Sequence, residues 1–281
     1  MLREYKEYII SGNKVGSNKA ASYIKALEYI GPILKQSNSV YSKFDSIWEV
    51  VDVEFVSDLY KYILEQQKLG HSGIFQNGFP KSYWKGGFYS AAIKSYLEFL
   101  IIMQYESELW PFVDQIKDAK KLGSVLNQKE IKHIEKLADE TTEFSGLEGK
   151  SCLALVKKRI NQDFFRKMVL KNFSSRCCIT GLNIPEVLRA SHIIPWSKDK
   201  ENRLNPENGL CLSATYDAAF DRYLISFDDK YRLVLGKTIK DNATYDAVKE
   251  HFIAFEGKEM LVPRFFMPAK DFLQKHLDSI C

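Results

Sequence analysis

The sequence has few features that would set it apart from ordinary globular proteins. No apolar run approaches the roughly 18 residues that a membrane-spanning helix needs, and charges begin at Arg3 where a leader would be apolar. The five cysteines are an odd number and two are adjacent, which favours reduced thiols over a disulfide framework. We therefore expect a cytoplasmic protein with no membrane partner.

Paired Cys-x-x-Cys motifs are also missing. Gly181 stands three residues after Cys178, and Cys211 is alone in an apolar segment. Because structural zinc sites are closed by four protein ligands, we expect no structural zinc and interpret both cysteines as small buried residues. Four of the five histidines have no spacing that indicates a site: His71, His133, His251 and His276.

The net charge is only +4, but the basic excess lies in the C-terminal half. Between Lys150 and Arg176 there are eight basic residues and a single acid, Asp163. Such a local positive field attracts polyanions, although a solvated helix face would have the same composition. The segment is therefore a candidate nucleic-acid-binding surface.

The first half of the chain predicts helices. Apolar residues recur at helical spacing in residues 18–34, 53–68 and 89–109. A glycine-rich and aromatic segment, Phe75–Phe88, interrupts them and is either a recognition loop or a packed irregular loop. A polar stretch ending near residue 148 then separates the two halves. We predict a mainly helical recognition or regulatory domain over residues 1–148.

The second half predicts a mixed domain over residues 149–281, giving an α+β protein. A basic helix over residues 151–175 has apolar residues along one face. Short strands and turns follow, and a final helix is predicted over Ala269–Leu277. The predicted strands lie in residues 187–193, 209–213, 223–229 and 231–236.

Three residues in this half have side chains suited to phosphodiester hydrolysis. The reaction needs a base for water and a positive centre for the developing negative charge. His192, at the end of a predicted strand, could be the base, and Asp217, on a short predicted helix, could hold a hard cation. Asn208, just before the second strand, could hydrogen-bond the backbone and orient the histidine.

Five ordered motifs in residues 150–235 resemble those of a known family. They read "NQDFFRKMVL", "CCITGL", "RASHIIPW", "RLNPENGLCLS" and "YDAAFDRYLISF". This order is similar to that of the His-Asn-His (HNH) endonucleases of the ββα-metal fold, and more narrowly to the subgroup found in bacterial restriction and defence nucleases. The resemblance implies a divalent metal, Mg²⁺ or Mn²⁺, and DNA as the substrate. It does not extend to residues 1–145.

The resemblance also assigns roles to individual residues. It implies that His192 is the general base, that Asn208 braces its loop and that Asp217 contributes to the metal. Ser191 stands where many family members have an aspartate ligand, which leaves the ligand set open. Asp221 is expected to be a cap or hydrogen-bond acceptor, and Trp196 a packing residue.

Six residues of the basic helix are the predicted DNA contacts, which would hold the backbone without reading sequence. They are Lys157, Lys158, Arg159, Gln162, Arg166 and Lys167. Arg166, within the family's "QxxFR" element, could instead anchor the helix to the nuclease core.

The sequence leaves several functions open. The first is a restriction endonuclease whose N-terminal domain selects the target and which works as a homodimer, because two strands must be cut. The second is a defence nuclease that a ligand or partner activates through that domain. The third is a DNA-binding protein that has lost cleavage, with RNA and other phosphodiester substrates also open.

Overall fold

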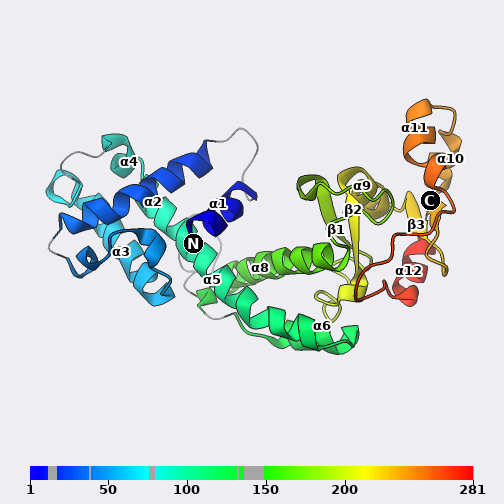
Figure 1. Cartoon of the computed structure of the whole chain (residues 1–281), viewed down its shortest axis with the longest axis horizontal. Helices are drawn as coiled ribbons and strands as arrows, with labels where there is room; N and C mark the ends of the chain where they lie inside the picture. The colour runs from blue at the N-terminus through cyan, green and yellow to red at the C-terminus, as the bar shows by residue number, and fades with distance from the viewer. Residues whose placement is uncertain (12–17, 38, 76–79, 132, 136–148, 281) are drawn as a thin grey trace. The chain divides into compact units, whose positions relative to one another are not determined.

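The computed structural model describes the chain except for residues 12–17, 38, 76–79, 132, 136–148 and 281. The described residues form two compact units (Figure 1). The N-terminal unit comprises Met1–Ser107 and Ile131–Lys157, and the C-terminal unit comprises Glu108–Glu130 and Lys158–Cys281. None of the helices among the described residues is long and apolar enough to cross a membrane.

The division of the chain differs from a single boundary at residue 148, because Glu108–Glu130 belongs to the C-terminal unit. Two contacts hold this segment there. The Lys171 ammonium lies 2.9 Å from the Asp114 carboxylate. The Trp110 ring packs on Phe164, with centroids 5.2 Å apart. Periodicity along the chain marks the helices, but it does not reveal that the last two turns of one helix pack with a later part of the sequence.

The N-terminal unit is built from helices, as predicted. Helix α3 (Val53–Leu69) begins at Asp52, whose carboxylate accepts a 2.7 Å hydrogen bond from the Phe55 amide. It ends at Gly70, which has a φ of 60°. Its predicted apolar stripe is buried. The helices are α1 (Leu2–Ser11), α2 (Lys19–Lys35), α3 (Val53–Leu69), α4 (Lys81–Lys85) and α5 (Phe88–Gln115), which continues into the C-terminal unit. Short 3₁₀ turns lie at Val40–Lys43, Ile47–Glu49 and Gly70–Ser72.

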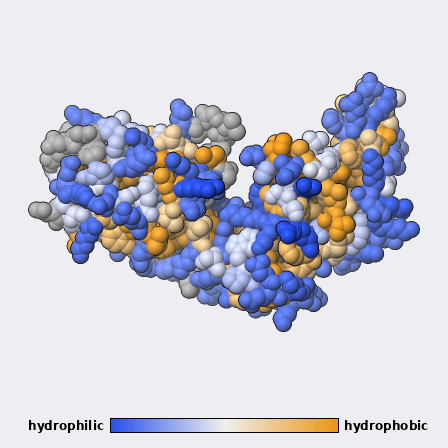
Figure 2. Space-filling model, viewed as in Figure 1, coloured by the Kyte–Doolittle hydropathy of each residue, from blue (hydrophilic) through white to orange (hydrophobic). Residues whose placement is uncertain are grey.

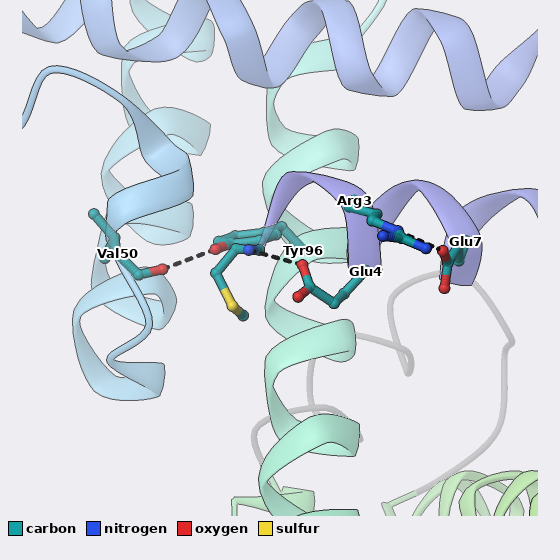
Figure 3. Close-up of polar contacts among 6 residues, drawn as sticks. Arg3, Glu4, Glu7, Val50 and Tyr96 are labelled. Atoms are coloured by element: carbon teal, nitrogen blue, oxygen red, sulfur yellow. Dashed lines mark hydrogen bonds and ion pairs between the residues drawn. The ribbon is translucent and has the colours of Figure 1, made fainter.

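Aromatic rings fill much of the core of this unit. Tyr5 lies edge-on to Tyr96 and Phe99, with ring centroids 5.5 Å apart in both pairs. The Tyr96 hydroxyl donates a 2.9 Å hydrogen bond to the Val50 carbonyl, so the buried ring also fixes the turn before α3 (Figure 3). On the exposed side of α1, Arg3 pairs with a glutamate one turn along.

The described part of the glycine-rich segment packs inward. Phe75 is buried and stacks on Tyr89 with an interplanar angle of 3°, and Trp84 is buried as well. Tyr83 contacts Phe88 and Tyr89. These contacts favour the packed-loop interpretation of Phe75–Phe88, while residues 76–79 lie outside the described residues.

The C-terminal unit contains the predicted strand–strand–helix arrangement. Strand β1 (Leu188–His192) pairs antiparallel with β2 (Gly209–Ser213), in a register that sets His192 opposite Gly209. Helix α9 (Ala214–Asp221) follows at once and packs on both strands. The second half of α8 (Gly149–Asn172) packs against β2: a Cβ on Gly209 would lie only 2.9 Å from Phe165. The absence of a side chain at Gly209 therefore allows α8 to approach the strands.

The last third of the unit adds a second hairpin and three α-helices. Strand β3 (Ile225–Phe227) pairs antiparallel with β4 (Leu233–Leu235). Helix α12 (Lys270–Leu277), one residue shorter than predicted, packs against β3. The side chains around α10 and α11 are mainly hydrophilic on the face drawn in Figure 2. The other helices are α6 (Ala119–Gln128), α10 (Lys237–Asp241) and α11 (Asp246–His251).

The buried His276 fixes α12 to the rest of this unit. Its Nδ1 lies 3.0 Å from the Ser226 hydroxyl on β3, and its Nε2 lies 3.1 Å from the Phe220 carbonyl on α9. The ring also stacks on Phe220 with centroids 3.7 Å apart. Both ring nitrogens are therefore used in packing, which agrees with the prediction that this histidine is not part of a site.

Candidate active site

His192 lies at the end of β1, partly buried between two aromatic rings. Its imidazole stacks on Phe165 of α8, with centroids 3.7 Å apart, and meets the edge of Trp196 at 5.3 Å. Its Nε2 lies 3.0 Å from the Arg203 carbonyl. Because a carbonyl only accepts, Nε2 carries the hydrogen and the neutral ring has its free lone pair on Nδ1.

The environment of His192 keeps the ring neutral near pH 7. Burial lowers the pKa of His192 to about 4, against the opposing effect of the Arg203 carbonyl, and the positive charge of Arg203 lowers the pKa further. A neutral imidazole with a fixed tautomer is the form in which histidine can accept a proton. The ring is therefore oriented and in the basic form before any substrate binds.

Asn208 is fully buried and braces the loop that follows His192. Its Oδ1 accepts a 2.7 Å hydrogen bond from the Ile194 amide, and its Nδ2 donates to the Ile194 and Asn202 carbonyls at 3.1 and 3.0 Å. The Asn208 carbonyl accepts a further bond from the Ile193 amide. These hydrogen bonds connect the two ends of the β1–β2 connection.

A second set of side chains stabilises the same connection. Asp199 accepts hydrogen bonds from the Glu201 and Asn202 amides and from the Asn202 side chain. Asn205 donates to the Asn202 side chain at 2.8 Å. Sequence reasoning missed these residues, although aspartate and asparagine are common in turns because their side chains bond nearby backbone amides. They fix the backbone whose carbonyl orients His192.

Asp217 lies in the first turn of α9 and accepts a hydrogen bond from the Ser191 hydroxyl. Ser191 occupies the position where many members of the similar family have an aspartate ligand. It lies on β1 and orients the Asp217 carboxylate of α9. Asp221 lies one turn further along α9, and its pKa is raised by burial and by the negative charge of Asp217. Among the described residues no hydrogen bond from a cap position reaches Asp221, so the expected capping role is not seen there.

These two carboxylates are the donors that this part of the unit offers to a cation. No group of three or more histidine, cysteine, aspartate or glutamate side chains in the described ranges is arranged as a metal site. Mg²⁺ keeps several water ligands and often uses only one or two carboxylates together with substrate phosphates. Burial is the larger cause of the raised pKa of Asp221, and a cation would relieve the smaller cause, the negative charge of Asp217. The donor set therefore fits a hydrated hard cation.

The three described cysteines of this unit are small buried residues, as predicted for two of them. Cys177, Cys178 and Cys211 are all fully buried and free. Burial raises the pKa of the Cys211 thiol to about 12, with a further contribution from Cys177. Burial also raises the pKa of Cys178, so the Cys178 and Cys211 thiols are protonated at neutral pH and belong to the core of this unit.

Arg166 is fixed to the strand that carries His192. Its guanidinium donates to the Leu188 carbonyl at 2.8 Å and to the Pro185 carbonyl at 3.0 Å. This is the anchoring alternative considered for the "QxxFR" element. Burial lowers the pKa of Arg166, as does the nearby charge of Arg189, which also donates to the Leu188 carbonyl. Arg189 was missed by the sequence reasoning.

The other predicted DNA contacts lie along α8 in varied environments. Lys158, Arg159 and Gln162 are exposed and Lys157 is partly buried. Lys167 pairs with Asp163 at 3.0 Å. The division between the compact units passes between Lys157 and Lys158. Within the C-terminal unit Lys158, Arg159 and Gln162 are exposed to solvent, whereas Lys167 is partly neutralised.

Comparison with protein families gives a match within this part of the chain. Residues 177–228 match the family model described as HNH endonuclease. The matched range contains β1, β2 and α9 with His192, Asn208 and Asp217. No curated protein matches the chain significantly.

Proposed function

We propose that this protein is an endonuclease that hydrolyses DNA phosphodiester bonds with His192 as the general base. The observation that carries the proposal is the fixed tautomer of His192, whose Nε2–H is bonded to the Arg203 carbonyl and whose Nδ1 keeps its lone pair. The match of residues 177–228 to the HNH endonuclease model supports the reaction class.

In this mechanism Nδ1 of His192 takes a proton from the attacking water. A pKa near 4 makes the free imidazole a weak base. A phosphate placed beside the ring supplies negative charge, which favours the protonated form and raises the pKa toward the working pH. Phe165 and Trp196 hold the ring in place while the water is oriented. The hydrogen bonds of Asn208 hold the loop in place, and with it the Arg203 carbonyl that contacts the base.

Asp217 would hold a divalent cation, Mg²⁺ or Mn²⁺, with Ser191 orienting its carboxylate and Asp221 as a second donor. The cation would stabilise negative charge on the phosphate and on the leaving oxygen. The serine at position 191 is compatible with such a site, since it orients a ligand instead of being one.

The remaining elements of the proposal concern target choice. Residues of α8 would bind the DNA backbone, giving affinity without sequence information: the exposed Lys158, Arg159 and Gln162 and the partly buried Lys157, with Arg166 and Lys167 nearby on the helix. The N-terminal unit, in place of the whole of residues 1–148, would select the target, as in a bacterial restriction enzyme, and a homodimer would cut both strands. A nuclease silent until a ligand or partner binds this region is the alternative, and it predicts little basal cleavage at any sequence.

The test is cleavage of supercoiled plasmid and modified-phage DNA by the wild type, His192→Ala and the matched control His251→Ala. His251 is an exposed histidine on α11, so its replacement removes an imidazole without touching the site. Metal-dependent fragments from the wild type and the control, absent with His192→Ala and with chelator, are expected. DNA binding with no cutting by any variant, in magnesium or manganese, would refute the proposal for the isolated protein and favour the activated or cleavage-deficient alternatives.

A further inference from the structure

Three contacts hold Arg203 in place, one from its backbone to His192 and two from its guanidinium to Trp196. The Arg203 carbonyl accepts the hydrogen bond from His192. The Arg203 Nε donates a 2.9 Å hydrogen bond to the Trp196 carbonyl, and the guanidinium carbon lies 5.1 Å from the centroid of the Trp196 ring. Since Trp196 also meets the edge of His192, the base, the tryptophan and the arginine form one packed group.

The two terminal nitrogens of Arg203 remain available to a ligand. Only Nε of its donors is used within the described part of the chain, and no carboxylate there lies within ion-pair distance of the side chain. Two other cations of the C-terminal unit are paired with carboxylates: Arg232 with Asp228 and Lys171 with Asp114. An arginine held on an aromatic face, with its terminal fork free, is suited to bidentate recognition of phosphate.

The cation of Arg203 also acts on the base itself, because its charge is among the causes that lower the pKa of His192. The other groups that pack on the imidazole, Phe165 and Trp196, are uncharged. A fixed positive charge next to an uncharged imidazole favours an anion at the same place. The packed group thus combines a proton acceptor with an unpaired cation.

We propose that Arg203 binds a non-bridging oxygen of the phosphate that is cleaved and holds that phosphate beside Nδ1 of His192. This inference rests on the proposed nuclease function and adds a substrate-binding residue to the site. A phosphodiester bound there would be neutralised by the guanidinium while the base acts on water, which is the arrangement that favours charge developing in the transition state.

The test measures DNA binding in chelator, where no cutting can occur, by the anisotropy of a short fluorescein-labelled duplex over a range of salt concentrations. Each phosphate contact on duplex DNA contributes about 0.9 to the slope of log affinity against log salt, so Arg203→Gln is expected to lower the slope by about 0.9. The matched control is Lys249→Gln, which removes an exposed cation paired with Asp246 and should leave the slope unchanged.

A second variant separates phosphate binding from a purely structural role. Arg203→Lys keeps the charge but loses the fork, so it should keep the salt slope and cut DNA about tenfold or more slowly in single-turnover reactions. Arg203→Gln with a wild-type slope, or Arg203→Lys with a wild-type rate, would overturn the inference. If the wild type never cuts DNA but Arg203→Gln still lowers the slope of log affinity against log salt, the nuclease proposal is refuted. The contact between Arg203 and a phosphate would then still stand.

Discussion

Replacing Asn208 by aspartate tests the brace of the β1–β2 loop without changing its size. The asparagine donates through Nδ2 to two carbonyls and accepts through Oδ1 from one amide, and it is fully buried. A carboxylate keeps the acceptor but faces the Ile194 and Asn202 carbonyls with negative charge. Burial and these carbonyls should raise the pKa of the introduced carboxyl in the folded state, and buried carboxyls rise by up to about 3–5 units.

The magnitude follows from linkage. A rise of about three units corresponds to roughly 4 kcal/mol of lost stability at neutral pH, since each unit is about 1.4 kcal/mol. The folded pKa is raised, so the penalty is present above that pKa and is relieved as the pH falls toward the unfolded value near 3.9. As the pH falls from 7 to 5, the stability that Asn208→Asp has lost relative to the wild type should therefore become smaller.

Urea unfolding followed by circular dichroism at pH 7, 6 and 5 measures this effect. The control is Asn208→Ala, which leaves three backbone groups without partners and should lose about 3 kcal/mol or more at every pH. If the free energies of unfolding of Asn208→Asp and the wild type differ by the same amount from pH 7 to pH 5, the side chain does not face the two carbonyls as described.

Three further predictions concern the packing around the site. Gly209→Ala should destabilise the protein by about 1–3 kcal/mol in urea unfolding, because the added Cβ meets Phe165, whereas a change within 0.5 kcal/mol would contradict that close approach. Arg166→Gln should lower the melting temperature but leave the salt slope of DNA binding unchanged, since its fork bonds two carbonyls; a lowered slope would instead make it a phosphate contact. The pKa of His276 is lowered by burial to about 4, so its stabilising contribution is present above pH 6.5 and is lost as the pH falls toward 4, by about 3 kcal/mol. The free energy of unfolding of His276→Gln should therefore fall less than that of the wild type as the pH falls toward 4. An equal fall in both proteins would refute this assignment.

The sequence predicted the parts of the site that depend on local pattern. His192 at a strand end, Asn208 before the second strand and Asp217 on the following helix lie where the motifs indicated. The helices of the N-terminal unit follow from apolar spacing, as the buried stripe of α3 demonstrates. In each case neighbouring residues carry the information.

The features that sequence reasoning missed depend on contacts between distant segments. Phe165 stacks on His192 from a helix that precedes the motif, and no periodicity marks that pair. Arg203 orients the base through its backbone, so its side-chain type gave no signal for that contact. The placement of Glu108–Glu130 with the later chain also arises from tertiary packing. The Ser191 hydroxyl is a further case, because its role in orienting Asp217 depends on the fold bringing the two residues together.

The most direct test of the central claim is the single-turnover cleavage rate of His192→Gln in magnesium. Glutamine can still donate to the Arg203 carbonyl, but it cannot accept a proton from water. If His192 is the general base, the rate should fall by about 10²–10⁴-fold while DNA affinity in chelator stays at the wild-type value. A His192→Gln protein that cuts DNA at the wild-type rate would contradict the assignment of His192 as the base.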